Sequence, residues 1–136
     1  MDTVKLKVII ESTENNYSAY IENLDGIVAT GETIAEIKDH MHSAIRVFME
    51  TCREVNGEIP DVLKGNYELE FRMDVKSLLN LYTGIFTKSG LERLTGINQK
   101  QLWHYAHGIS KPREAQVRKI ESALHRLGDE LLAIQL

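Results

Sequence analysis

Residues 87–112 read TKSGLERLTGINQKQLWHYAHGISKP, and their pattern predicts how the second half of the chain folds. Thr87 and Asn98 each precede a run with helical spacing, and both residue types cap the N-termini of helices. Gly96 lies between the two runs and permits a sharp turn, because glycine adopts left-handed backbone conformations without strain. The pattern therefore predicts two short helices that meet at a tight corner.

Apolar residues within this stretch predict how the two helices pack. Ile97 is expected to plug the angle between them, and the small Gly90 is expected to let them approach closely. The shared core is expected to consist of Leu91, Leu94 and Leu102. An ordinary small helical bundle without a ligand is the alternative to a ligand-binding motif.

This arrangement resembles the helix-turn-helix domain of Cro/C1-type repressors, in which the second helix of the pair enters the major groove of DNA. The resemblance covers residues 75–136 and includes the exit from the second helix at Gly108 and Pro112. It implies an all-α domain of five helices. In that pattern a helix opens at Pro112 and is interrupted at Gly128.

The same resemblance assigns residues that contact DNA. Gln99, Lys100 and His104 match positions that reach base edges, where glutamine pairs with adenine and lysine donates to guanine. The positions that contact the DNA backbone or support the reading helix are matched by Lys88, Asn98, Gln101, Lys111 and Arg113. Trp103 is expected to pack sideways rather than read a base, and Glu92 is expected to be solvated helix surface.

The residues before 75 alternate between strand patterns and one helix pattern. Strands are expected at 3–10, 17–21, 27–30 and 67–73. A long helix is expected to follow Thr33, because Thr33 and Glu36 match a capping box. Its apolar stripe consists of Ile37, Met41, Ala44, Ile45, Phe48, Cys52 and Val55. It is expected to end at Asn56–Gly57, with the glycine in the left-handed cap.

A second resemblance rests on YSAYIENLDG at residues 17–26 and TGETIAE at residues 30–36. These runs are similar to the N-terminal domain of HicB-family antitoxins. The resemblance implies a truncated RNase H-like ββ(β)αβ fold without nuclease activity. The whole chain is then an α+β protein, with a HicB-like domain at residues 1–74 and a helix-turn-helix domain at residues 75–136.

Charge divides the chain in the same place. Residues 1–74 hold seven Lys/Arg against fifteen Asp/Glu, a balance of −8, whereas residues 75–136 hold nine against five, a balance of +4. The basic half suits a polyanion, and the acidic half suits a basic protein. Chance variation between two solvated surfaces is the alternative interpretation.

The two resemblances together imply the antitoxin of a HicA/HicB-like system. Such a protein neutralises a small basic RNA-cleaving toxin of the HicA type by direct binding, and it represses its own operon by binding operator DNA. The alternative is a stand-alone transcriptional regulator whose N-terminal domain senses a ligand or mediates oligomerisation. A nuclease is not expected, because the first strand carries none of the clustered carboxylates that hold divalent ions.

The remaining expectations concern assembly and location. Homodimers or larger homo-oligomers are expected, because two half-sites give useful affinity for DNA. The C-terminal apolar residues are either a dimer contact or a packing surface for their own domain: Leu127, Leu131, Leu132, Ile134 and Leu136. No membrane, cofactor or metal is expected, and the single Cys52 suits a reducing cytoplasm.

Overall fold

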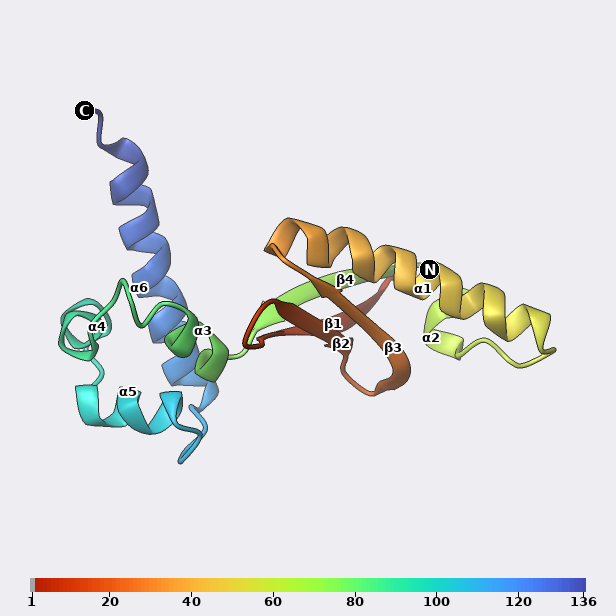
Figure 1. The fold of residues 1–136 in the computed structure, drawn as a ribbon, viewed down its shortest axis with the longest axis horizontal. Coiled ribbons are helices and arrows are strands. Elements are labelled where there is room, and N and C mark those ends of the chain that lie inside the picture. Colours follow the sequence, from red (N-terminus) through yellow and green to blue (C-terminus); the bar gives the residue numbers. More distant parts are fainter. Residues whose placement is uncertain (1) are drawn as a thin grey trace. The chain divides into compact units, whose positions relative to one another are not determined.

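The computed structural model describes residues 2–136, which form four strands and six helices (Figure 1). This composition confirms the α+β class. The chain divides into two compact units, one ending at Asp74 and the other running from Val75 to Leu136.

The first unit is built on a four-stranded mixed sheet. Its strands are β1 (Val4–Ser12), β2 (Tyr17–Ile21), β3 (Leu24–Gly31) and β4 (Tyr67–Met73). They lie in the order β3-β2-β1-β4, with β1 parallel to β4 and the other pairs antiparallel. A parallel pair needs a crossover connection, and helix α1 (Ile34–Glu54) lies in that connection.

Helix α1 covers one face of the sheet with Ile37, Met41 and Ile45, all fully buried. One bond of the expected capping box is present, because the Glu36 N–H donates to the Thr33 hydroxyl at 3.1 Å. The Glu36 carboxylate accepts from the Glu32 N–H at 2.7 Å, one residue before the expected Thr33. Gly31 permits the helix to begin close to β3, because an added Cβ would lie only 3.1 Å from the Glu36 Cβ.

Several boundaries in this unit differ from the expectation. Asn23 adopts φ 65°, which tightens the turn, so that β3 already begins at Leu24. The left-handed residue after α1 is Asn56, with φ 55°, rather than Gly57. Val55 is 70% exposed and lies outside the core, because α1 ends before it. A short helix that was not expected, α2 (Asp61–Lys64), buries Leu63 ahead of β4.

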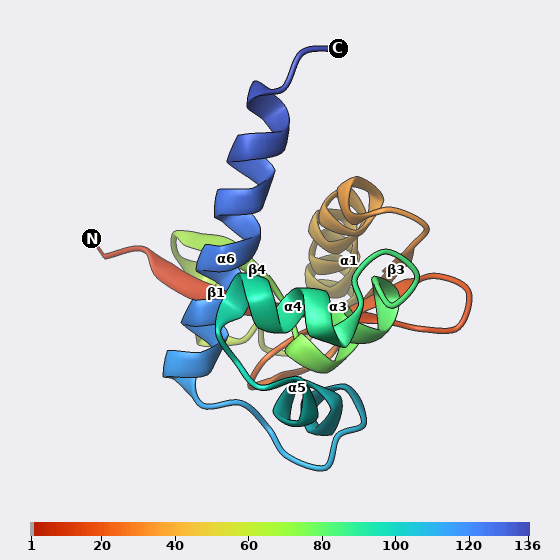
Figure 2. The ribbon, with the colours of Figure 1, turned by 90° about the vertical axis from the view of Figure 1, so that its left-hand side faces the viewer.

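The second unit consists of α3 (Val75–Leu81), α4 (Lys88–Thr95), α5 (Gln99–Ala106) and α6 (Glu114–Ala133), shown in Figure 2. Its core is centred on Leu79, Leu91, Leu102 and Ile120. The described residues of this unit form four helices, so the expected count of five is wrong. Gly128 does not interrupt α6, because its conformational cost of about 1 kcal/mol is too small to end a long helix.

Candidate nucleic-acid interface

The corner between α4 and α5 is fixed by backbone geometry and by one hydroxyl. Gly96 ends α4 with φ 76°, and its N–H donates to the Glu92 carbonyl at 2.8 Å. The Thr95 hydroxyl donates to the Leu91 carbonyl at 2.7 Å and accepts from the Ile97 N–H at 3.1 Å. Ile97 is 3% exposed, so its side chain fills the corner as expected.

Gly90 does not have the expected role. A Cβ added at Gly90 would meet only the Thr87 hydroxyl, at 3.0 Å, and no described atom of α5. That hydroxyl caps α4 by accepting from the Gly90 N–H at 2.9 Å. The absence of a side chain at Gly90 therefore leaves room for the cap of its own helix rather than for the neighbouring helix.

Two side chains hold the start of α5. The Asn98 amide oxygen accepts from the Lys100 N–H at 2.8 Å, as the sequence predicts. The Glu92 carboxylate accepts from the Gln99 N–H at 3.1 Å, so Glu92 is a second cap and not merely solvated surface. A carboxylate is favoured there because the N-terminus of a helix carries partial positive charge.

The residues expected to read bases lie on α5. Gln99 and Lys100 are exposed in its first turn, and His104 is half-buried one turn after Lys100. Opposite this surface, Leu102 is fully buried and holds the helix against the unit. Lys100 and His104, four residues apart, share one face of the helix.

Trp103 lies beside these residues and is 45% exposed. Its ring stacks on the His107 imidazole, with centroids 3.8 Å apart and planes 23° apart. The His107 Nδ1 donates to the Trp103 carbonyl at 2.9 Å, which fixes the imidazole in that position. Trp103 therefore packs sideways along α5 and forms a flat aromatic surface next to His104.

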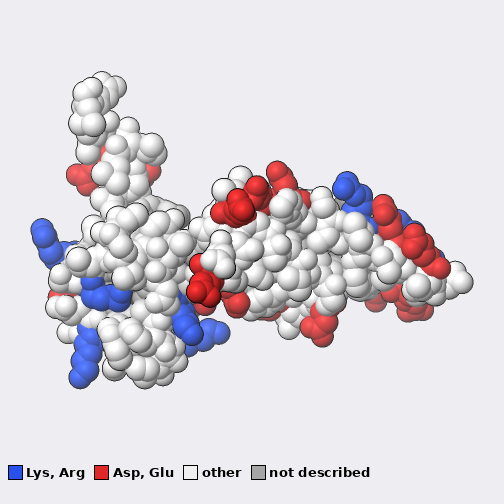
Figure 3. Space-filling view, in the orientation of Figure 1, with Lys and Arg blue, Asp and Glu red and all other residues white. Residues whose placement is uncertain are grey.

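The supporting residues are placed less uniformly. The Gln101 amide donates to the Ser110 hydroxyl at 3.0 Å, so it braces the segment after α5. Lys88 is half-buried at the start of α4, and Lys111 and Arg113 are exposed ahead of α6. Within residues 2–136, the ion pairs do not include Lys88, Lys100, Lys111 or Arg113. Figure 3 shows blue Lys and Arg side chains on this unit.

Two residues that contact the C-terminal end of α5 could not be identified from the sequence. The Asn80 amide on α3 donates to the Ala106 carbonyl at 2.9 Å, across 26 positions of sequence. The Lys76 ammonium would lie 3.3 Å from a Cβ added at Gly108, which has φ 71°. The Lys76 ammonium and the Asn80 amide both lie at the C-terminus of α5, where positive charge and hydrogen-bond donors are favoured.

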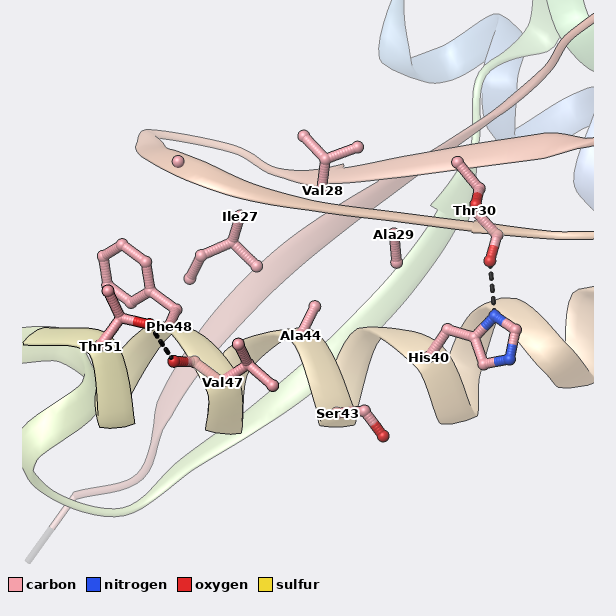
Figure 4. A pocket seen from close by; sticks show the side chains of 11 residues that line it. Ile27, Val28, Ala29, Thr30, His40, Ser43, Ala44, Val47, Phe48 and Thr51 are labelled. Carbon is pink, nitrogen blue, oxygen red and sulfur yellow. Dashed lines mark hydrogen bonds between the residues drawn. The ribbon is translucent and has the colours of Figure 1, made fainter.

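A second candidate site lies in the first unit, in a groove of about 580 Å³ between β3 and α1. Figure 4 shows Ile27 and Ala29 pointing from β3 toward the helix. The helix side is formed by His40, Ser43, Ala44, Val47, Phe48 and Thr51. The His40 Nδ1 donates to the Thr30 carbonyl at 2.6 Å, which joins the groove walls at one end.

Comparison with family models, with curated proteins and with solved structures gives no match for this chain. Among residues 2–136, no group of three or more His, Cys, Asp or Glu side chains is placed to hold a metal ion. None of the helices in the same range has the length and apolarity needed to cross a membrane.

Proposed function

We propose that this chain is the antitoxin of a HicA/HicB-like toxin–antitoxin system and represses its own operon. Its C-terminal unit is a Cro/C1-type helix-turn-helix domain that binds operator DNA. Its N-terminal unit is a HicB-like, truncated RNase H-like domain that binds a small basic RNA-cleaving toxin. The protein is not an enzyme in this account, and it works in the cytoplasm.

One observation carries the DNA-binding half of the proposal. A corner closed by a left-handed glycine presents α5 with Gln99, Lys100 and His104 accessible on its surface. A short helix held in this way fits the major groove of DNA, which is about 12 Å wide. Lys88, Lys111 and Arg113 supply cations for phosphates on either side of the reading helix.

The antitoxin half rests on fold and charge. The strand–strand–strand–helix–strand order agrees with the order that the HicB resemblance implies, apart from the added turn of α2. The first unit carries a balance of −8, which favours association with a cationic protein and disfavours contact with nucleic acid.

Asn98 and Gln101 have structural roles in the proposed DNA-reading unit, because both side chains form hydrogen bonds within that unit.

The C-terminal end of α6 supports the proposal of a dimer. Leu131 is 57% exposed, Leu132 is 86% exposed and Ile134 is 54% exposed, so their own unit leaves most of this apolar surface uncovered. In Figure 2 this end of α6 extends beyond the other helices of the unit. We infer that it contacts a second copy, which would bring two reading helices to two half-sites.

The stand-alone regulator remains the second candidate, favoured by the groove beside β3, which is large enough for a small ligand. The two candidate functions predict different products from the adjacent reading frame, and a binding experiment distinguishes them. The product of the adjacent reading frame is purified and mixed with this chain, and its RNA cleavage is measured. The antitoxin predicts a stable complex that abolishes cleavage. A chain that binds its promoter but leaves the neighbouring product active is a regulator instead.

A further inference from the structure

The outer edge of β3 is an unpaired strand edge beside an apolar groove. β3 is the last strand on its side of the described sheet, so its outward backbone groups have no strand partner there. Such an edge is a template for an additional strand, and proteins use it to bind extended peptide segments. Ile27 and Ala29 are buried under α1, whereas Val28 is 62% exposed on the opposite side of the strand.

The bond to His40 shows which backbone groups point outward. The Thr30 carbonyl is directed at His40 of α1 rather than at β2 (Figure 4). In an antiparallel strand, the N–H and C=O of one residue point the same way, and the direction alternates along the strand. Val28 therefore directs both of its backbone groups to the free edge, and Thr30 directs its N–H there. His40 occupies only the Thr30 carbonyl.

Charge around the groove is predominantly negative. Glu36 lies one turn before His40, while Glu50 and Glu54 lie three residues after Val47 and Thr51, so these carboxylates border the groove side of α1. Arg46 adds one positive charge to this border, because it lies three residues after Ser43, whereas the Lys38 ammonium lies 5.6 Å from the centroid of Phe71 in β4, away from the groove. The groove therefore suits an occupant with positive charge.

We propose that the groove between β3 and α1 binds an extended, lysine- or arginine-rich segment of a partner protein, which joins the sheet as an additional strand beside β3. Backbone bonds to Val28 and Thr30 supply affinity. Apolar side chains enter between Ala29 and Val47, and basic side chains meet the bordering carboxylates. A second copy of this chain fits poorly, because two acidic borders would face each other. The inference rests on the proposed function, whose toxin-facing surface it assigns.

The His40 imidazole competes with an added strand for this edge, because it already bonds to the Thr30 carbonyl. A strand that pairs fully with Thr30 has to replace the imidazole at the Thr30 carbonyl. Loss of the imidazole removes that competition and leaves the edge open. His40→Ala is therefore expected to tighten binding about threefold, which a purely structural role of His40 would not do.

The direct experiment uses the isotope-labelled full chain and a blocked peptide of about eight residues in which lysine and valine alternate. Nuclear magnetic resonance follows the exchange of backbone amide protons. Addition of the peptide is expected to protect the amides of Val28 and Thr30, and a glutamate–valine peptide is not expected to bind. Unchanged exchange at both amides, or equal binding of the two peptides, overturns the proposal. Protection without peptide that rises with protein concentration identifies a second copy as the occupant, and also overturns it.

A matched pair of substitutions tests the groove itself. Val47→Asn removes an apolar side chain that lines it, whereas Val55→Asn changes a comparably exposed valine beyond the end of the same helix. Val47→Asn is expected to weaken peptide binding about fivefold and Val55→Asn to leave it unchanged. Equal effects would contradict the assignment.

The proposal for the groove and the proposal of an antitoxin can be contradicted independently of each other. A chain that takes up the lysine–valine peptide at β3 but ignores the neighbouring frame's product keeps the groove as a binding site and loses the proposed partner. A chain that binds this product with unchanged exchange at Val28 and Thr30 keeps the function and loses the groove.

Discussion

Glu92 illustrates how a single side chain can fix a helix to which it does not belong. Its carboxylate accepts from the first N–H of α5, and its own residue lies in the middle of α4. The bond spans seven positions across a turn, so no helical or strand periodicity could have predicted it. Asn98, by contrast, was predictable as a cap because capping is local and depends on residue type.

The residues proposed to read bases should separate from those that only bind phosphate. We expect Lys100→Ala and His104→Ala to weaken binding to the operator by about tenfold, because each variant can no longer bond to a base edge. Their affinity for a scrambled duplex should change less. Lys88→Ala should weaken binding to both duplexes, because phosphates carry no sequence information. Titrations by fluorescence anisotropy measure all three. Unchanged operator affinity of Lys100→Ala would mean that α5 is not the reading helix.

The ion pair between Arg72 and Glu70 on β4 is expected to make the stability of the fold depend on pH. The Arg72 guanidinium donates to the Glu70 carboxylate at 2.7 Å and, with its positive charge, lowers the pKa of Glu70 from its ordinary 4.5. Because folding lowers this pKa, the pair stabilises the fold above the unfolded pKa, and this contribution is lost as the pH falls toward the folded pKa.

Arg72→Gln should raise the pKa of Glu70 toward its ordinary value, as read from the side-chain carboxyl resonance in an acid titration. Lys5→Gln is the matched control, because Lys5 lowers the same pKa less than Arg72 does. Equal changes in the two variants would mean that the hydrogen bond from Arg72 is not the main cause.

Among the helices of the second unit, substitutions of Gly96 and Gly128 are expected to have opposite effects on stability. Neither Gly96 nor Gly128 has a described atom within 4 Å of an added Cβ, so only the backbone distinguishes them. Gly96 has φ 76°, whereas Gly128 lies inside α6. Gly96→Ala should lower the free energy of unfolding by about 1–2 kcal/mol, and Gly128→Ala should raise it by up to about 1 kcal/mol.

Chemical denaturation of the full chain followed by circular dichroism measures both changes. A stabilising Gly96→Ala would contradict the left-handed backbone of Gly96. A destabilising Gly128→Ala would specifically favour the interruption that the sequence predicts at this position.

Most elements could be predicted because their signals are local. Alternation identified β1 and β4, and the capping pair Thr33–Glu36 identified the start of α1. α2 was missed because one turn is too short for any periodicity to develop. The end of α1 was assigned to the wrong residue because asparagine and glycine both tolerate left-handed backbone, and only the structure distinguishes Asn56 from Gly57.

At the scale of the whole molecule, pairing between distant strands was beyond the sequence. The parallel pairing of β1 with β4 joins residues about sixty positions apart, such as Val8 and Phe71, and the two strand patterns alone do not determine their neighbours. The groove was missed for the same reason, since its walls come from β3 and α1 and exist only after they pack. The corner between α4 and α5 and the residues proposed to read bases lie within one short stretch, so both could be proposed from the sequence.

Assembly is also tested at this scale. If α6 forms the dimer contact, Leu131→Asp should convert dimers to monomers in sedimentation experiments, because it places a charge on an exposed apolar face. Val55→Asp is the control, since Val55 is also exposed but lies in the first unit. A wild-type chain that is monomeric throughout, or a Leu131→Asp variant that still dimerises, would remove α6 from the interface.

The salt dependence of binding between the full chain and the promoter region upstream of its own gene tests whether α5 reads DNA. We predict specific binding whose affinity falls steeply as salt rises. Lys88→Ala should reduce the slope by about two for the dimer, because one phosphate per subunit then keeps its counterion. Affinity that does not respond to salt, or that is equal for the promoter and a scrambled duplex, would contradict the assignment of α5 as a DNA-reading helix.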